Sequence, residues 1–190
     1  QFVAVTRPAG TIIRVGAAVT GLRRYLAVRG GIDVEPVLGS RSTDTLSGLG
    51  PAPLRAGDEL GIGAQPAGPI SGATLPGPVS ARPLRIVAGP REDWFRPGAL
   101  AELTPGRWTV GADSDRIGVR LAGPPLVRVR PEELPSEATL PGALQVPPSG
   151  QPILLGPDAP VTGGYPVIAV VHSADRHRAG QLRPGEVVRF

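Results

Sequence analysis

Three short polar segments flanked by glycine hold most of the residues that could do chemistry in this chain. They are residues 39–44, 114–118 and 162–166, and each lies between apolar runs of the kind that form strands. Loops carried by a β-scaffold are where proteins commonly place the groups that contact a ligand. These loops are therefore the first candidates for a binding or catalytic site.

The first segment places Arg41, Ser42 and Asp44 in one loop. The planar guanidinium of Arg41 could hold a carboxylate or a phosphate through two parallel hydrogen bonds, and the Ser42 hydroxyl could add a donor. The same residues also suit an ordinary turn, in which Asp44 caps the backbone and pairs with Arg41. The residues alone leave both interpretations open.

The second segment, with the two residues before it, brings Asp113, Asp115 and Arg116 together at a turn. Two carboxylates beside a guanidinium could bind a polar substrate or serve as an acid–base pair. They could equally form a surface ion pair of small energetic value.

The third segment contains Gly163, Gly164 and Tyr165, and the stretch before it contains Glu137 and Gln145. A Gly-Gly turn can direct two backbone amides at an anion or a carbonyl oxygen. The alternative is a tight hairpin turn in which Tyr165 covers the edge of the core.

Composition excludes several kinds of site. The chain has no Cys and no Lys, so it offers no disulfide, no thiolate ligand or nucleophile, and no Schiff-base or phosphate-loop lysine. Its two histidines, His172 and His177, are not at ligand spacing with a carboxylate pair, and a protein zinc site needs three or four convergent ligands. We therefore expect no metal site.

Charge and hydropathy exclude two classes of partner. The net charge is +4, and all 20 basic residues are arginines that are spread along the chain, Arg23 and Arg24 being adjacent, without a basic run of five or more. This pattern argues against nucleic-acid binding. No apolar stretch reaches the roughly 18 residues that a membrane helix needs, so no membrane partner is expected.

The elements that must position these loops are predicted to be strands. Short runs rich in Val, Ile and Leu recur between 27 Gly and 24 Pro residues, which is typical of an all-β barrel or sandwich. The predicted strands are residues 2–5, 11–15, 22–28, 59–62, 84–87, 108–110, 119–121, 126–129, 151–155, 167–171 and 187–190. Helical signal is weak: residues 93–103 are interrupted by Pro97, and a turn around 174–182 has Ser173 as its expected N-cap.

Residues 65–82 are rich in Pro, Gly and Ser and are predicted to form a linker. They separate residues 1–64, read as the C-terminal remainder of a first β-module, from residues 83–190, read as a barrel domain. The chain begins at Gln1 inside a predicted strand, so we expect an earlier part of the protein to precede it. Residues 54–60 and 182–188 repeat one pattern, a glycine turn that leads into a strand.

Taken in order, these segments resemble the allophanate hydrolase subunit 2 family, also called the biotin-dependent carboxyltransferase family or the family of 5-oxoprolinase C subunits. The resemblance covers almost the whole chain and rests on residues 21–34, 36–44, 54–58, 114–118, 121–125, 135–137, 142–147, 150–152 and 162–166. It implies a cyclophilin-like β-barrel in the C-terminal part, preceded by a smaller β-module.

The resemblance also implies an activity. The chain would be a cytoplasmic subunit of a heteromeric bacterial 5-oxoprolinase, an ATP-dependent amidohydrolase that opens 5-oxoproline to glutamate, and would be inactive alone. ATP would be shared with the partner subunits. One partner would be a related cyclophilin-like protein of the allophanate hydrolase subunit 1 type, which is the B subunit of 5-oxoprolinase, and the other would be a third subunit. Two alternatives stay open: a carboxyltransferase module of the urea carboxylase type, which would use biotin, and a non-catalytic regulatory subunit that antagonises a kinase inhibitor.

Carried over by position, the resemblance implies a set of site residues. The catalytic set is Arg41, Asp44, Asp115, Arg116, Glu137 and Tyr165, and the substrate-binding set is Ser42, Gln145, Gly163 and Gly164. The chain departs from the family pattern at Ala138, where Gly is common, at Pro160-Val161, where Gln-Thr is usual, and at Val167, where a Lys or Arg often follows Tyr-Pro. If that cation holds a carboxylate, the site of this member is altered.

Overall fold

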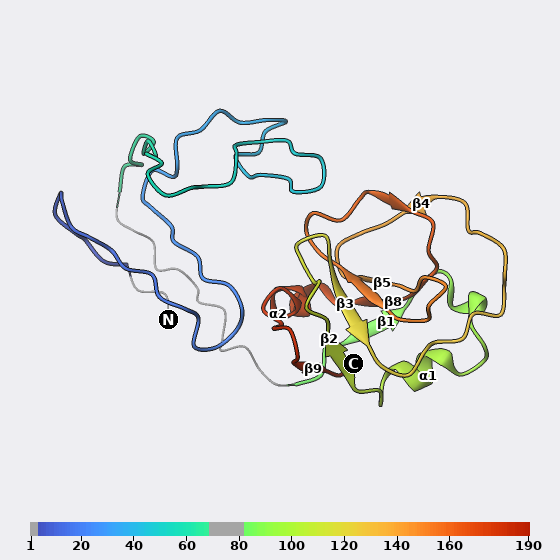
Figure 1. Ribbon diagram of the computed structural model, residues 1–190. Coiled ribbons are helices and arrows are strands. Elements are labelled where there is room, and N and C mark those ends of the chain that lie inside the picture. Colours follow the sequence, from blue (N-terminus) through green and yellow to red (C-terminus); the bar gives the residue numbers. More distant parts are fainter. Residues whose placement is uncertain (1–3, 69–81) are drawn as a thin grey trace.

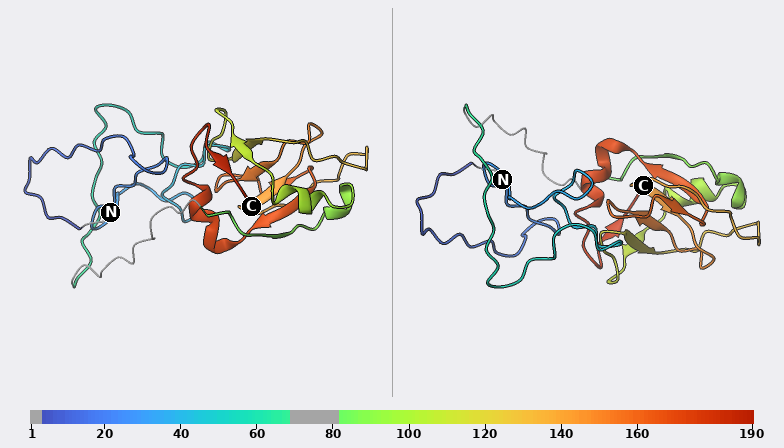
Figure 2. Two further views of the ribbon diagram at one scale, coloured as in Figure 1. Left: turned by 90° about the horizontal axis from the view of Figure 1, so that it is seen from below. Right: turned by 90° about the horizontal axis from the view of Figure 1, so that it is seen from above.

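A computed structural model describes residues 4–68 and 82–190 of the chain (Figure 1). Every named helix and strand lies in the second range. The first range consists of turns and extended chain, and it lies beside the folded second part in all three views (Figure 2). The predicted linker, residues 65–82, falls largely outside the described residues.

A seven-stranded antiparallel sheet forms the body of the second part, with the spatial order β1-β8-β5-β6-β3-β2-β9. Its strands are β1 (Ile86–Ala88), β2 (Trp108–Val110), β3 (Gly118–Ala122), β5 (Ala143–Gln145), β6 (Ile153–Leu155), β8 (Val167–Val171) and β9 (Val187–Val188). The Leu84 amide, just before β1, donates to the Arg189 carbonyl, just after β9, at 2.9 Å. The two edges of the sheet therefore curl toward each other, which confirms an all-β, barrel-like fold for this part.

The main core fills the inside of this curl. Its largest fully buried side chains include Trp108, Leu103, Leu121, Leu144, Leu154 and Ile168. Leu103 ends the helix α1 (Ala99–Leu103), and its carbonyl accepts a hydrogen bond from the indole Nε1 of Trp108 at 3.0 Å. The one polar atom of the buried Trp108 ring is thus satisfied, so the ring contributes its full apolar area to the core.

A second, smaller core lies on the other face of the sheet. Ala143, Leu155 and Val167 are buried there, with Ile153 and Val170 packed against them. Strands β4 (Glu137–Ala138) and β7 (Thr162–Gly163) pair with each other in a separate, antiparallel two-stranded sheet. Strand β8 is apolar throughout because its residues enter both cores.

The remaining elements are short helical turns. The predicted helix over 93–103 is two pieces, the 3-10 turn η1 (Glu92–Trp94) and α1. Near the C-terminus, η2 (Ser173–Asp175) leads into α2 (Arg176–Ala179). The expected N-cap at Ser173 is wrong, because the preceding His172 accepts the Ala174 amide on its Nδ1 at 3.3 Å.

Several predicted strands do not form. Residues 11–15, 22–28 and 59–62 contain no strand, and the bridge between Ile32 and Ile62 is their nearest approach to one. Their apolar side chains, such as Ile12 and Leu26, are exposed, and a strand needs a paired neighbour and a buried face to be stable. The prediction for residues 2–5 lies partly outside the described residues.

Residues 126–129 also form no strand. Their pairing partner is a short stretch that begins at the last residue of η1, where the Val129 amide donates to the Trp94 carbonyl at 2.9 Å, and continues at Phe95, which bridges Arg128. Because helical turns bound that stretch on both sides, the ladder cannot lengthen.

Side chains of the second part hold the first part in place. Gln181 accepts the backbone amides of Leu22 and Arg23 on its Oε1, both at 2.8 Å. Arg183 donates to the carbonyls of Gly21 and Ala18 at 2.7 and 2.6 Å. These contacts fix residues 18–23 against the segment that follows α2.

Within the ranges 4–68 and 82–190, no helix has the length and apolar character needed to cross a bilayer.

Candidate functional site

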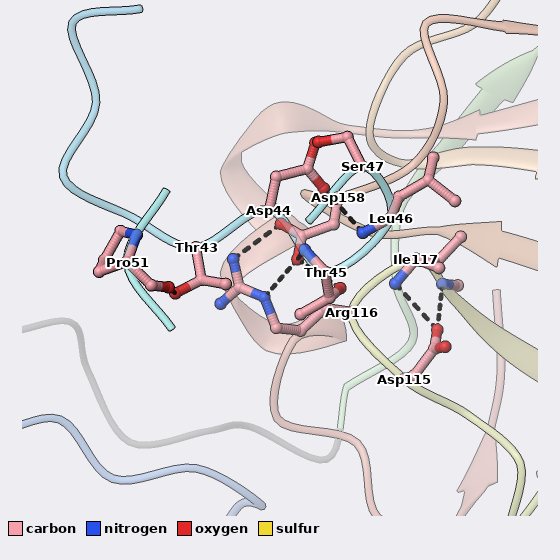
Figure 3. Close-up of polar contacts among 11 residues, drawn as sticks. Thr43, Asp44, Thr45, Leu46, Ser47, Pro51, Asp115, Arg116, Ile117 and Asp158 are labelled. Carbon is pink, nitrogen blue, oxygen red and sulfur yellow. Dashed lines mark hydrogen bonds and ion pairs between the residues drawn. The ribbon is translucent and has the colours of Figure 1, made fainter. Parts of the chain in front are cut away.

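Most of the predicted site residues fall into two groups, and the loop of residues 39–44 leads into the first. The junction group consists of Thr45, Asp115, Arg116 and Asp158, and it lies where the loop of residues 39–51 meets the barrel (Figure 3). The hairpin group surrounds the β4–β7 pair and consists of Arg91, Glu137, Gln145, Gly163, Gly164 and Tyr165.

Asp44 organises the loop of residues 39–51. Its carboxylate accepts the Leu46 amide at 2.9 Å and the Ser47 hydroxyl at 2.8 Å, and these two bonds lower the pKa of Asp44 below its ordinary value. Its backbone amide donates to the Leu49 carbonyl at 2.8 Å. The capping-turn interpretation of this residue is therefore what the geometry shows.

Arg41, earlier in the same loop, is exposed. Its Nε donates to the Val34 carbonyl at 2.9 Å, and its Nη2 lies 3.8 Å from the Asp33 carboxylate, a long and screened contact. The alternative in which Arg41 pairs with Asp44 is wrong, because Asp33 is its ionic neighbour. The Ser42 amide donates to the Ser40 hydroxyl at 3.1 Å. The guanidinium of Arg41 is thus open to an incoming anion.

Arg116 is engaged by a carboxylate that the sequence did not point to. Its Nε and Nη2 donate to the two oxygens of Asp158, both at 2.7 Å, which is the bidentate geometry of a strong pair (Figure 3). Thr45 donates to the same carboxylate, from its hydroxyl at 2.9 Å and its amide at 3.4 Å. The pKa of Asp158 is lowered to about 2, chiefly by the hydrogen bonds from Arg116. The pKa of Arg116 is raised, chiefly by its hydrogen bonds to Asp158.

Asp115 closes the turn that starts β3. Its Oδ1 accepts the amides of Ile117 at 2.9 Å and Gly118 at 3.0 Å. The neighbouring Asp113 pairs with Arg120 at 3.0 Å, and both side chains are exposed. The structure therefore separates the three predicted charges: Asp115 supports a turn, Arg116 joins Asp158, and Asp113 forms a surface ion pair.

The hairpin group is built around a directly opposed pair of residues. Glu137 of β4 stands opposite Gly163 of β7, and Arg91 grips the Glu137 carboxylate through its Nε at 2.9 Å and through its Nη2. Gln145 is buried, and its Nε2 donates to the Tyr165 carbonyl at 3.3 Å. The Tyr165 side chain itself is exposed.

Gly163 leaves room for the end of the buried Gln145 side chain. A Cβ there would lie 2.6 Å from the Gln145 Nε2, closer than real Cβ atoms approach. At Gly164 a Cβ would lie 3.1 Å from the Leu134 carbonyl. The hairpin group therefore presents a fixed carboxylate, a buried amide side chain, a phenol and a bare backbone turn, which together can hydrogen-bond a small polar molecule.

Among the residues described, no cluster of three or more His, Asp or Glu side chains is placed to hold a metal ion.

Sequence reasoning missed Arg91, Thr45 and Asp158. Asp158 lies in a Gly-Pro-Asp turn between two predicted strands, and Arg91 follows a Gly-Pro pair, so both positions had a loop signal. The sequence could not reveal their partners, because Thr45 and Asp158 are 113 residues apart and Arg91 and Glu137 are 46 apart.

Comparison with known proteins shows which family this sequence and fold match. The family model described as carboxyltransferase domain, subdomain A and B, matches residues 1–190. The chain is 39% identical to the C subunit of 5-oxoprolinase from Escherichia coli over 90% of this chain and 56% of that protein, and 38% identical to the Haemophilus influenzae protein of the same name over 96% and 60%. It is 32% identical to the urea amidolyase of Lachancea kluyveri over 95% of this chain and 11% of that protein.

Solved structures agree. The crystal structure of TTHA0988 matches with a TM-score of 0.78 at 39% identity over 91% of this chain and 34% of that one. The urea amidolyase of K. lactis matches with a TM-score of 0.77 at 29% identity over 90% of this chain and 12% of that one. The chain thus spans somewhat over half the length of the two 5-oxoprolinase subunits that it resembles.

Proposed function

Because the chain belongs to the carboxyltransferase domain, subdomain A and B, family, we propose that it serves as a subunit of a heteromeric ATP-dependent 5-oxoprolinase. The observation that carries this proposal is the 39% and 38% identity to two 5-oxoprolinase C subunits across nearly the whole chain. In the reaction, the oxygen of water bonds to the lactam carbonyl carbon, the carbon–nitrogen bond breaks, and the nitrogen takes up a proton to give glutamate.

We assign recognition of the lactam to the hairpin group. A lactam presents one N–H donor and one carbonyl acceptor. The Glu137 carboxylate, held by Arg91, can accept from the lactam nitrogen or from the attacking water, and the Tyr165 phenol and the Gly164 amide can donate to the carbonyl oxygen. Gln145 sets the position of the Tyr165 backbone through its 3.3 Å bond.

We assign the anion of the reaction to Arg41, since its guanidinium makes a single carbonyl bond and one long ionic contact. That anion is the 5-oxoproline carboxylate or a phosphate of ATP. ATP would bind in a site shared with the partner subunits, which we propose to be the B subunit of the 5-oxoprolinase and a third subunit, all in the cytoplasm. The chain itself contains no phosphate-loop motif.

A second candidate function has its own support. Two urea amidolyases and a urea carboxylase match at 28–32% identity in sequence or structure, and the family name is that of a carboxyltransferase domain. In that case the same hydrogen-bonding groups would hold urea, whose amide chemistry is close to that of a lactam, and biotin on a carrier would deliver the carboxyl group.

Ligand-induced stabilisation separates these candidates without turnover. A ligand at 100 times its Kd stabilises a protein by about 2.7 kcal/mol, which is a clear rise in melting temperature. We expect 5-oxoproline or ATP to raise the melting temperature of the co-expressed complex, Arg41→Ala to reduce that rise, and Arg14→Ala, at another exposed arginine, to leave it unchanged. A rise with urea alone would favour the carboxyltransferase, and no rise with any of them would favour a regulatory subunit.

A further inference from the structure

Asp158 links the two parts of the chain through one carboxylate. It receives two bonds from Arg116 of the barrel and one from the Thr45 hydroxyl in the loop of residues 39–51. Its side chain is only 7% exposed, so these partners rather than water satisfy it. A buried carboxylate that bridges two distant segments fixes their relative position.

The loop can transmit this constraint because it is internally braced. The Thr43 hydroxyl donates to the Pro51 carbonyl at 2.7 Å. The Asp44 amide donates to the Leu49 carbonyl, and the Asp44 carboxylate accepts the Leu46 amide. Arg41 lies four residues before Thr45 in this braced loop. Holding Thr45 therefore restricts where the Arg41 guanidinium can lie.

The bidentate pair also changes the role of Arg116. Two of its three guanidinium nitrogens are bound to Asp158, whereas both terminal nitrogens of Arg41 lack a short ionic contact among the described residues. The two arginines predicted as catalytic thus differ: Arg116 belongs to the junction, and the terminal nitrogens of Arg41 are open to an anion.

We propose that Asp158 is a positioning residue, which acts through Thr45 to hold the loop of residues 39–51, and with it Arg41, against the barrel. The effect on substrate binding rests on the proposed function of Arg41, but the positioning itself does not. The contacts of Gln181 and Arg183 with residues 18–23 are separate, so weakening the junction leaves the first part attached.

The absence of cysteine makes the position of the loop directly measurable. Spin labels on Leu38→Cys and Val161→Cys, whose native side chains are 92% and 81% exposed, would report the distance between the loop and the barrel in the assembled complex. Thr45→Val removes the hydroxyl bond at constant shape and leaves the Arg116–Asp158 pair intact, and Thr45→Ser restores the hydroxyl.

We expect Thr45→Val to broaden or shift the label distance and to raise the KM for the anion that Arg41 binds by roughly three- to tenfold, the range for one lost hydrogen bond, with a smaller effect on kcat. Thr45→Ser should return both readouts to near the wild-type values. An unchanged distance in Thr45→Val would overturn the inference whatever the activity. A changed distance with an unchanged KM would overturn the part of the inference in which the loop carries Arg41 with it. A changed distance in a complex whose wild type does not turn over 5-oxoproline would uphold the positioning and refute the proposed function.

Discussion

Replacing Asp158 with Asn should destabilise the protein at neutral pH, and the loss should fade in acid. Arg116 and Thr45 hold the pKa of Asp158 at about 2, against an ordinary 3.8. At about 1.4 kcal/mol for each pH unit, this difference corresponds to about 2 kcal/mol of folding free energy. Because the Arg116 side chain is 41% exposed, solvent screening brings the expected loss to about 1–2 kcal/mol.

The direction of the pH dependence follows from the lowered pKa. The carboxylate stabilises the fold above pH 3.8, where it is ionised in both states, and this stabilisation is lost as the pH falls toward 2. Urea unfolding of wild type and Asp158→Asn at pH 7, 5, 4 and 3 would measure the free energy of unfolding of each protein across this titration. The difference between the two proteins should be largest at pH 7 and 5 and should shrink at pH 3.

A matched control is Asp113→Asn. Asp113 also pairs with an arginine, Arg120, at 3.0 Å, but its side chain is 71% exposed, so we expect a change within about 0.5 kcal/mol. A loss in Asp158→Asn that is equally large at pH 3 would show that packing rather than charge stabilises the junction. A control loss of the same size as that of Asp158→Asn would refute the argument from burial.

Two further substitutions probe the core and the hairpin group. Leu103→Ala should cost about 2–5 kcal/mol in urea unfolding, because Leu103 is fully buried beside Trp108; a loss under about 1 kcal/mol would contradict this packing. Gly163→Ala should lower kcat/KM of the complex at least about tenfold, because the new Cβ would lie 2.6 Å from the Gln145 Nε2 and would displace that amide. The control Gly16→Ala, whose Cβ meets nothing within 4 Å, should match wild type. Equal activities of the two variants would contradict the assigned site.

The strands that the sequence predicted well are those with a strong local pattern. Trp108–Val110 and Val167–Val171 form strands at the predicted residues, the first alternating buried and exposed, the second apolar on both faces. The repeated turn is also confirmed: Arg55–Asp58 and Arg183–Glu186 each close with a backbone bond and an acidic side chain that accepts the first amide. Gly57 and Gly185 both have positive φ there, which favours glycine.

Tertiary pairing decides the strands that the sequence missed. Glu137–Ala138, Ala143–Gln145 and Thr162–Gly163 are two or three residues long and have no apolar alternation of their own. They are strands because distant segments pair with them, and they carry much of the hairpin group. In contrast, residues 11–15 and 22–28 have the local pattern but no described partner, so the pattern alone overpredicted them.

The candidate site was predictable in its residue types more than in its contacts. Sequence reasoning selected Arg41 and Arg116 equally, yet one is exposed and the other is gripped by Asp158. Which arginine is free depends on a carboxylate that lies 42 residues after Arg116, and no local pattern encodes that pairing.

The decisive assay is 5-oxoproline-dependent ATP hydrolysis by the protein assembled with its partner subunits. We predict turnover that disappears when this subunit is omitted and persists in Arg14→Ala. In Arg41→Ala it should fall by about ten- to hundredfold with an unchanged melting temperature, as expected for loss of a charged ligand contact. Turnover that persists without this subunit, or that requires urea and a biotin carrier instead of 5-oxoproline, would contradict it.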